Sequence, residues 1–359
     1  MRIAVLGVGL IGGSVGLAAR ERLGAEVRGF DSDAGRLERA RELGAVSTAH
    51  GSAADAVDGA EIVFCAGPVA TLPALAREAV DAAGEDAAVT DVGSVKRELT
   101  AALGSDPRFV GGHPLAGAET AGVENARTDL FDGARWYLTP TERTGGVIYD
   151  RVQRVLADLG ARPQAIDPEA HDRLMAAVSH LPHVLANLLV ERAAKAAGDE
   201  EERLPETGPS FRDATRVAGA NPAIWGDILT ANGEAIAAEA EAVAAELERL
   251  AAKLREGDGA AVGAWHERAA ERRRELLEAE LEGGPLRELR VLVPNRPGIV
   301  AEIALALGRA GVNIEDMGLY PAADMRSGAI TLYVAGDPEA ERAAEIVRGL
   351  GHDVSAVER

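Results

Sequence analysis

The segment VGGHPLAG, residues 110–117, places one histidine, His113, among glycine, alanine, proline and aliphatic residues. No neighbouring side chain in this segment can form an ion pair with the imidazole. The two preceding glycines lack a Cβ, so they let the backbone come unusually close to the ring. Because imidazole changes charge near neutral pH, it is widely used for proton transfer and as a metal ligand. His113 is therefore a candidate functional residue.

Two further histidines stand in the segment SHLPH, where His180 and His183 are three residues apart in a predicted helix. At this spacing they broadly share one face, so a metal site is one interpretation. No convincing set of carboxylates or cysteines accompanies them, and packing or capping histidines are the ordinary alternative. Pro182 lacks the N–H that the carbonyl of Val178 would accept, so we also predict a helix kink there.

Two arginines, Arg212 and Arg216, are four residues apart in the segment FRDATR. On a helix they would share a face, and Asp213 between them can orient a guanidinium. Such a pair suits bidentate recognition of a carboxylate. The alternative is a solvated helix start capped by Ser210, and the segment alone leaves both interpretations open.

The N-terminus carries a dinucleotide-binding pattern in its full context. Residues 2–6 form a predicted buried strand, and the turn GVGLIG at 7–12 leads into a helix and a second strand that ends at Asp31. The glycines permit the tight turn, the approach of a pyrophosphate, and close packing of helix on strand. A carboxylate about 20 residues on bonds the adenosine ribose and repels a 2′-phosphate, and Ser32 and Asp33 supply no cation, so we expect NAD. The expected cofactor contacts here are Gly7, Gly9, Leu10, Ile11, Gly12 and Asp31.

The alternation of strands and helices then continues along the chain. Strands are predicted over residues 61–66, 87–92, 135–139 and 162–166, with helices over 72–83 and 148–159. Turns follow the carboxyl ends of the first two strands, at the edge where a doubly wound sheet binds ligands. Without the nucleotide motif, each would be an ordinary strand-to-helix turn. The additional cofactor contacts expected at these turns are Gly67, Pro68 and Asp91.

The composition of the 359-residue chain restricts the partners and the cellular compartment that we expect for it. Its formal net charge is −20 at pH 7. This acidity argues against nucleic acid or an anionic membrane as a partner, and an anionic substrate would need a local basic pocket. Cys65 is the only cysteine, which excludes an intrachain disulfide and favours a reducing compartment. The N-terminal apolar run continues into a second strand, and no other run looks long and apolar enough to cross a bilayer, so we expect a cytoplasmic protein.

The chain divides into three predicted domains, at residues 1–166, 167–284 and 285–359. The first is α/β with a Rossmann-type sheet, and the second is all-α, built from alanine-rich amphipathic helices. After the linker GGP, the third shows the order strand, helix, strand, strand, helix, strand, which suggests a small α+β, ferredoxin-like module. Its strands are predicted over residues 288–293, 313–320, 329–334 and 353–357, and its helices over 298–310 and 338–349.

Together these motifs resemble the prephenate/arogenate dehydrogenase family in order and spacing, from residue 1 to about 280. The segments that carry the resemblance are VGGHPLAG, DVGSVK at 91–96, SHLPH, FRDATR and NPAIW at 221–225. The segments NRPG at 295–298 and GVNI at 311–314 resemble an ACT domain. The resemblance implies a nucleotide-binding domain, a helical domain that forms an intertwined homodimer, and an ACT domain that binds an amino acid such as tyrosine or only reinforces the dimer.

The same resemblance implies NAD-dependent oxidative decarboxylation of prephenate to 4-hydroxyphenylpyruvate in tyrosine biosynthesis, with arogenate as the alternative substrate. His113 matches the catalytic histidine, on a loop stiffened by Pro114, and Ser94 matches the serine that helps orient it. A neutral His113 would accept a hydrogen bond from the substrate hydroxyl. The substrate-side matches are the histidine His180, the ring-carboxylate arginine Arg216 with Arg212 beside it, the interface tryptophan Trp225 and the entrance acid Glu119. Gly67 departs from the pattern, since many members have a bulkier or hydroxylated residue before the proline.

Two other functions stay open on the sequence. A β-hydroxyacid dehydrogenase or an imine reductase would share the first two domains, but those families typically rely on a catalytic lysine or other groups in the helical domain. A non-enzymatic sensor of NAD and amino acids would share the domain order as well. Such a sensor would not reduce NAD when prephenate is added.

Overall fold

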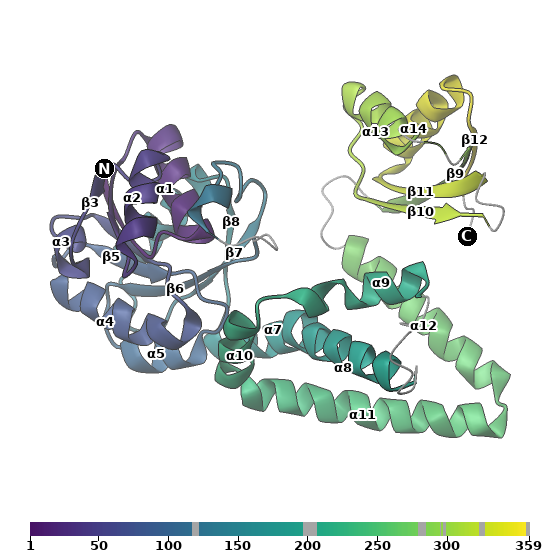
Figure 1. Cartoon of the computed structure of the whole chain (residues 1–359), viewed down its shortest axis with the longest axis horizontal. Coiled ribbons are helices and arrows are strands. Elements are labelled where there is room, and N and C mark those ends of the chain that lie inside the picture. Colours follow the sequence, from purple (N-terminus) through teal and green to yellow (C-terminus); the bar gives the residue numbers. More distant parts are fainter. Residues whose placement is uncertain are drawn as a thin grey trace. The chain divides into compact units, whose positions relative to one another are not determined.

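Figure 1 shows the computed structural model, which describes residues 1–116, 122–196, 207–278, 285–294, 296, 299–322 and 327–356. The chain forms two compact units, Met1–Ala245 and Glu246–Arg359. Each unit has a hydrophobic core of its own: two clusters lie on the sheet of the first unit, and one lies on the sheet of the second.

An eight-stranded sheet in the order β3-β2-β1-β4-β5-β6-β7-β8 is the centre of the first unit. β1 to β6 are parallel, β7 is antiparallel to β6, and β8 is parallel to β7. The strand order reverses at β1, so the carboxyl ends of β1 and β4 form the edge where doubly wound sheets bind ligands. The strands are β1 (Arg2–Leu6), β2 (Glu26–Phe30), β3 (Thr48–Ala49), β4 (Ile62–Cys65), β5 (Ala88–Asp91), β6 (Phe109–Pro114), β7 (Arg135–Thr139) and β8 (Arg162–Ala165).

Helices cover both faces of this sheet, which is why its central strands are apolar on both sides (Figure 1). Ile3 and Val5 of β1 belong to one core with α1 and α6, whereas Ala4 and Leu6 belong to a second core with α3, α4 and α5. This alternation is the two-residue period of a strand. The helices are α1 (Leu10–Leu23), α2 (Ala34–Glu42), α3 (Ala53–Val57), α4 (Leu72–Ala82), α5 (Arg97–Leu103) and α6 (Gly146–Asp158).

The predicted Rossmann-type sheet is confirmed, but His113 lies on a strand and not in a loop. β6 extends through Pro114 and pairs with β5 and β7. Two glycines weaken the strand signal of this segment, because glycine is depleted in strands. The sheet needs them: a Cβ on Gly112 would collide with the carbonyl of Asp91, and a Cβ on Gly111 would collide with Thr139. Close packing of neighbouring strands therefore explains the glycines in front of His113.

A long helical run follows β8 and confirms the predicted helix. α7 (Pro168–Met175) and α8 (Leu181–Ala196) are joined by the π turn Ala176–His180, in which the amide of Leu181 donates to the carbonyl of Ala176. The wider turn adds one residue just before Pro182, so the irregularity predicted there takes the form of a π bulge. The remaining helices are α9 (Pro209–Thr215), α10 (Pro222–Ala231) and α11 (Gly233–Glu256), which begins in the first unit and ends in the second.

The run Pro168–Ala196 is long and apolar enough to cross a membrane, by length and composition only. This corrects the expectation that no such run exists. Core helices can be equally long and apolar, and 28% of the most apolar 18-residue stretch of this run is buried in the protein. Asp172 near its start accepts hydrogen bonds from the backbone at the start of α5, so this part of the run packs on the sheet domain.

The second unit contains α12 (Gly259–Glu278) and a four-stranded antiparallel sheet in the order β10-β11-β9-β12. The predicted order of strands and helices is confirmed. Ile303 of α13 and Val347 of α14 share a core with Val291 and Ile330 of the sheet, so both helices pack on the same sheet. The bounds are β9 (Leu286–Pro294), α13 (Ile299–Arg309), β10 (Asp316–Pro321), β11 (Ser327–Ala335), α14 (Asp337–Gly349) and β12 (Asp353–Ala356).

Candidate active site

The glycine-rich turn between β1 and α1 is shaped for a phosphate group. Gly7 has a φ of +95°, and a Cβ there would lie 2.5 Å from the carbonyl oxygen of Ala66. A Cβ on Gly12 would collide with the carbonyl of Gly7, so only glycine lets α1 approach β1 this closely. Apart from its chain neighbours, no atom of the described residues lies within 4 Å of a Cβ built on Gly9. α1 has neither a side-chain cap nor an acidic residue in its first turn, so its N-terminus and this open backbone fit a pyrophosphate.

Asp31 follows β2 beside this turn and is 7% exposed. Its carboxylate accepts hydrogen bonds from the backbone amides of Val8 and Asp33, both at 2.9 Å. The guanidinium of Arg36, on α2, lies 3.2 Å from the same carboxylate. Residues 32–33 supply no cation, but the first turn of α2 brings Arg36 back to Asp31. This corrects that part of the cofactor argument.

The loop after β4 lies against the glycine-rich turn. A Cβ on Gly12 would be 3.1 Å from the Cβ of Ala66, and Gly67 and Pro68 follow directly. They lead into the 3-10 turn Val69–Thr71, against which α10 packs. The helix that carries Trp225 is thereby placed next to the nucleotide edge of the sheet. The first residues of α1 at this edge, both half-buried, are Leu10 and Ile11.

Asp91, at the end of β5, is completely buried. Its carboxylate accepts the backbone amides of Gly93 and Gly112, at 2.7 and 2.9 Å, and forms an ion pair with the buried ammonium of Lys96. Lys96 also donates to the carbonyl of Gly112 at 2.7 Å. The carboxylate therefore ties the ends of β5 and β6 together. This corrects the expectation that the side chain of Asp91 contacts the cofactor.

The imidazole of His113 is the first of three linked side chains. Its Nδ1 lies 2.9 Å from Nε2 of His171 on α7, and Nδ1 of His171 lies 2.8 Å from Oδ1 of Asp172. His171 is fully buried and Asp172 is 4% exposed, so water does not compete for these hydrogen bonds. Asp172 also accepts the backbone amides of Lys96 and Arg97, at 2.8 and 2.9 Å. The α7 helix thus holds His113 at Nδ1, on the side of the ring opposite to Nε2.

Burial lowers the pKa of His113 well below its ordinary value, because the cationic form loses hydration. The neighbouring bases His171, Lys96 and His180 lower this pKa further. The imidazole is therefore neutral at pH 7. A neutral imidazole has one ring nitrogen that accepts a hydrogen bond, which is the form that a general base needs.

His180 lies in the π turn and is only 1% exposed. Its Nδ1 lies 3.0 Å from the side-chain amide nitrogen of Asn232, which also donates to the backbone carbonyl of Asp172 at 2.8 Å. Burial lowers the pKa of His180 to about 4. Because the ring is enclosed and already hydrogen-bonded, the expectation that His180 contacts the substrate needs correction: its observed partner is Asn232.

His183, one turn further along, is half-buried and stacks on Trp225, with ring centroids 3.3 Å apart and planes at 21°. Burial and the charge of Arg216 both lower the pKa of His183, against the hydrogen bond to the carbonyl of Ser179. Arg216 is exposed at the start of the turn Arg216–Gly219, which packs on α8. The structure therefore brings Trp225 and Arg216 to His183, for which the sequence suggested only a metal-binding, packing or capping role.

The predicted two-arginine fork is not formed on one helix. α9 ends at Thr215, and Arg216 begins a 3-10 turn, so the two arginines do not share an α-helical face. The guanidinium of Arg212 donates to the backbone carbonyl of Thr207 at 2.8 Å. The helix is capped by Gly208 and not by Ser210, which corrects the alternative interpretation as well.

Two predicted site residues gain no assignment from these contacts. Ser94 is half-buried between β5 and α5, and it makes no hydrogen bond to another residue in the part of the chain that the structure describes. Glu119 lies outside the described residues. Their roles stay predictions from the family resemblance.

The sequence analysis missed four residues of this site: Lys96, His171, Asp172 and Asn232. A signal was present for three of them. His171 and Asp172 are adjacent polar residues in the predicted helix that follows the sheet, and Lys96 follows a predicted buried strand, five residues after Asp91. Unpaired groups of this kind are costly to bury, so each predicts a partner from another element. The sequence does not say which groups meet, because the contacts that assemble the site, His113 with His171 and Lys96 with Asp172, join residues 58 and 76 positions apart.

Metal binding at the SHLPH segment gains no support. Among the residues that the structure describes, no group of three or more histidine, cysteine, aspartate or glutamate side chains could hold a metal ion. His180 is bonded to Asn232 and His183 stacks on Trp225. Both rings thus have protein partners.

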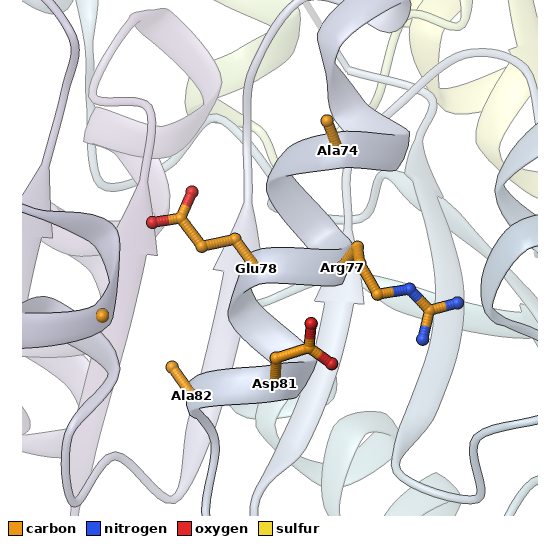
Figure 2. A pocket seen from close by; sticks show the side chains of 6 residues that line it. Ala74, Arg77, Glu78, Asp81 and Ala82 are labelled. Atoms are coloured by element: carbon orange, nitrogen blue, oxygen red, sulfur yellow. The ribbon is translucent and has the colours of Figure 1, made fainter.

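A surface hollow of ≈ 560 Å³ lies between α3 and α4. Figure 2 shows Arg77 and Glu78 extending to opposite sides of α4. Arg77 donates to the backbone carbonyl of Ala102, and most of the remaining lining is alanine. The hollow contains none of the residues around His113, and its polar groups do not converge on one point.

Three family models match consecutive parts of the chain. They are described as prephenate dehydrogenase, nucleotide-binding domain, at residues 15–164; prephenate dehydrogenase, dimerization domain, at 167–266; and ACT domain, at 287–352. The prephenate dehydrogenase of Bacillus subtilis (strain 168) is 28% identical over 360 residues, which cover 96% of this chain and 95% of that protein.

Two solved structures are similar over nearly their whole length. The prephenate dehydrogenase of Aquifex aeolicus, in complex with hydroxyphenyl propionate and NAD+, is 32% identical with a TM-score of 0.70, covering 76% of this chain and 97% of that chain. The arogenate dehydrogenase of Synechocystis is 27% identical with a TM-score of 0.67, covering 77% of this chain and 100% of that chain. With its glycine-rich turn, its buried histidine relay and these matches, the chain belongs to the prephenate dehydrogenase family.

Proposed function

We propose that this chain catalyses the NAD-dependent oxidative decarboxylation of prephenate to 4-hydroxyphenylpyruvate. The observation that carries the proposal is the neutral imidazole of His113 at the same edge of the sheet as the glycine-rich turn. β1 and β6 both belong to the parallel part of the sheet, so their carboxyl ends lie at one edge. The Aquifex aeolicus relative binds hydroxyphenyl propionate together with NAD+, which supports a pair of neighbouring sites here.

The chain's own groups perform the proton chemistry. NAD, when bound at the glycine-rich turn, supplies the hydride acceptor for the substrate carbon C4. His113 accepts the proton of the C4 hydroxyl at Nε2, since its Nδ1 is bonded to His171. Loss of CO2 from C1 then makes the ring aromatic. A positioned base contributes about 10²–10⁴-fold to the rate, and fixed orientation of the reactants contributes much of the rest.

Residues of the helical region are proposed to bind the carboxylates of the substrate. Prephenate is a dianion and the chain has a net charge of −20, so the substrate needs local cations. Arg216 is the proposed partner of the ring carboxylate, beside the stacked pair of His183 and Trp225. On the family resemblance alone, Arg212 is proposed as a second basic residue of the substrate site and Glu119 as an acid at its entrance. Ser94 is proposed, on the same ground, to help orient His113.

The direct test is NADH formation by the purified chain with NAD and either prephenate or arogenate. We expect kcat/KM to be higher with prephenate. A higher value with arogenate would make this chain an arogenate dehydrogenase, the name of the Synechocystis relative. Failure to reduce NAD with either substrate would contradict the proposal and favour a sensor.

Cofactor choice provides a first prediction. Asp31→Ser should narrow the preference for NAD over NADP by about 10–100-fold in kcat/KM, because it removes a carboxylate that repels the 2′-phosphate and releases the Arg36 guanidinium to bind it. One substitution should suffice, since the cation is already in place. Kinetics with both cofactors at fixed prephenate measure the ratio.

The double variant Asp31→Ser/Arg36→Ala is the matched control for this prediction. Its kcat/KM with NADP should lose most of the increase seen in Asp31→Ser. Its kcat/KM with NAD should stay as low as in Asp31→Ser. Equal use of NADP and NAD by the unmodified chain would contradict the proposed ribose site. So would an unchanged preference in Asp31→Ser that still folds.

The pH dependence provides a second prediction. His113 works as the neutral base, so kcat/KM should be constant near neutral pH and fall as the pH drops through the pKa of His113. Because burial lowers that pKa, the fall should begin below the ordinary histidine value of about 6.5. The measurement is kcat/KM for prephenate in overlapping buffers. A rate that rises with acidity would mean that His113 acts as a cationic acid instead.

We also propose that two copies associate through the helical region. Leu188, Leu189 and Val190 of α8 are 54%, 44% and 40% exposed, so successive large apolar side chains of this helix are open to a partner. The matching family model is described as a dimerization domain. Light scattering should therefore report a mass near twice 37.3 kDa.

Regulation by tyrosine at the ACT domain is a third prediction. An effector bound there lowers the rate even when prephenate is saturating, because it does not compete for the active site. Truncation after Gly284 should then abolish the tyrosine inhibition seen at saturating prephenate. Inhibition that survives truncation and disappears at high prephenate would place tyrosine in the active site, and the ACT domain would be structural.

The proposed domains are 1–166 for the nucleotide, 167–284 for substrate and dimer contacts, and 285–359 for regulation. A cytoplasmic location is proposed with them. It suits a reaction that draws on NAD and a protein whose single cysteine, Cys65, is buried and unpaired.

A further inference from the structure

We propose that His171 and Asp172 are positioning residues that fix the proton of His113 on Nδ1 and keep its Nε2 unprotonated toward the substrate. The inference rests on the proposed function and deepens it. It assigns the state of the catalytic histidine to one carboxylate, and it accounts for two buried polar residues on α7 that the reaction otherwise does not use.

Asp172 is the fixed end of this chain of hydrogen bonds. Its carboxylate accepts the backbone amides of Lys96 and Arg97, which begin α5, so it is anchored to the sheet domain and not only to its own helix. Burial disfavours its ionisation, but the hydrogen bond from His171 and the two amides outweigh burial and lower the pKa of Asp172. An ionised carboxylate can only accept hydrogen bonds. The Nδ1 of His171 must therefore carry a hydrogen and donate it.

The state of His113 follows from that of His171. A neutral imidazole with hydrogen on Nδ1 has a bare Nε2, which is an acceptor. This Nε2 of His171 lies 2.9 Å from Nδ1 of His113, so Nδ1 of His113 must be the donor. The lone pair of a neutral His113 is then on Nε2. One buried carboxylate thus determines the tautomers of two rings in sequence.

Packing holds the two rings in this arrangement. The His113 and His171 rings meet edge to face at 5.1 Å and 75°, and Tyr137 of β7 meets His171 in the same way at 5.7 Å and 81°. The His171 side chain is wholly enclosed, so rotation to another partner would leave a buried nitrogen without one. The titratable groups that face His113 from the elements packed around it are Asp91, Lys96, Tyr137, His171, Asp172 and His180.

The proton transfers of the proposed reaction explain why the tautomer of His113 matters. The proton of the substrate hydroxyl moves to Nε2 of His113, the O–H electron pair forms the C4 carbonyl, and hydride leaves C4 for NAD. The electron pair of the departing CO2 then enters the ring, and the oxygen recovers a proton as the phenol forms. Between these events His113 is a cation, and the charge of Asp172, relayed through His171, stabilises it.

Asp172→Asn is the central variant, because it keeps the shape and removes the charge. If the new amide nitrogen faces His171, His171 must carry its hydrogen on Nε2, which places the hydrogen of His113 on Nε2 and removes the base. Whichever way the new amide is oriented, its NH2 group faces one of the two backbone N–H groups, of Lys96 or Arg97, that donate to Asp172 in the unmodified chain. That hydrogen bond is then lost. We expect kcat to fall by about 10²-fold or more, with KM for prephenate changed by less than about threefold.

Asp167→Asn is the matched control on the same helix. Asp167 caps α7 by accepting the amide of Ala170 at 2.9 Å, but it has no contact with His113. Asparagine is an equally good cap, so this variant should keep the activity and thermal stability of the unmodified chain. Equal activity of Asp172→Asn and Asp167→Asn, with both folded, would overturn the proposal.

Two substitutions of His171 separate positioning from simple support. His171→Gln can still accept from His113 and donate to Asp172, so it should retain most of the kcat that His171→Leu loses. Both variants remove the same ring. If His171→Gln and His171→Leu lose kcat equally while NAD binding is kept, the hydrogen bond to His113 has no part in catalysis and the proposal fails.

Nitrogen-15 NMR of the histidine-labelled chain, without substrate, observes the tautomers directly. We expect His113 and His171 to carry hydrogen on Nδ1, and His113 to carry it on Nε2 in Asp172→Asn wherever the new amide nitrogen faces His171. The variants His113→Asn and His171→Gln assign the two signals. Hydrogen on Nε2 of His113 in the unmodified chain would overturn the proposal even if prephenate is turned over. Conversely, the expected tautomers with no turnover would leave this relay intact and refute the proposed function.

Discussion

Replacing His113 with asparagine is expected to lower kcat by about 10²–10⁴-fold while KM for prephenate stays near its original value. Asparagine fills a similar space at the end of β6 but cannot accept a proton from the substrate hydroxyl. The interaction that it removes strengthens as the hydroxyl loses its proton, so the loss appears in kcat. Steady-state kinetics at saturating NAD measure both constants.

Two controls accompany this experiment: the pH profile of the variant, and the substitution of a second histidine, His266. The acid limb of kcat/KM should disappear in His113→Asn, because the group that produces it is gone. His266→Asn, on the exposed surface of α12, should retain both the rate and the profile. A normal kcat with a raised KM in His113→Asn would mean that the histidine binds the substrate and takes no part in the chemistry.

Lys96→Met should destabilise the folded chain by about 3–5 kcal/mol, because it leaves the buried carboxylate of Asp91 without its cation. Both members of this ion pair are fully buried, and the pair joins β5 to the strand that carries His113. Methionine occupies nearly the volume of the lysine stem, so the loss reports the charge. Urea unfolding followed by circular dichroism measures it.

Two comparisons test the cause. Adding Asp91→Asn to Lys96→Met should recover part of the stability, because no buried charge is then left alone. Lys253→Met, which breaks an exposed ion pair with Glu256 on α11, should change stability little. If Lys96→Met and Lys253→Met behave alike, the buried pair does not hold this edge of the sheet.

The nucleotide part of the site could be predicted from the sequence because its determinants are local. The turn at residues 7–12 and Asp31 act through backbone geometry and helix packing within about 25 residues, and the structure gives Gly7, Gly9 and Gly12 the environments that this pattern requires. Arg36 lies within that range, five residues after Asp31, but the dinucleotide-binding pattern does not specify it. Its guanidinium returns to Asp31 only because α2 begins immediately after β2.

The substrate part depends on contacts between distant segments, which a motif does not encode. His113 and His171 are 58 positions apart, and Lys96 and Asp172 are 76 apart. The choice between His180 and His183 depends on the π turn, which turns His180 toward Asn232 and places His183 against Trp225. The proline in SHLPH predicts an irregular helix, but the direction in which each ring then points is decided by tertiary packing.

The most direct test of the central claim is the stoichiometry of the reaction with prephenate. Purified chain, NAD and a limiting amount of prephenate should yield NADH, CO2 and 4-hydroxyphenylpyruvate in equal amounts, because hydride transfer and decarboxylation occur on the same substrate molecule. His113→Asn should form all three together at the lower rate. NADH formation without CO2, or a product other than 4-hydroxyphenylpyruvate, would contradict the account.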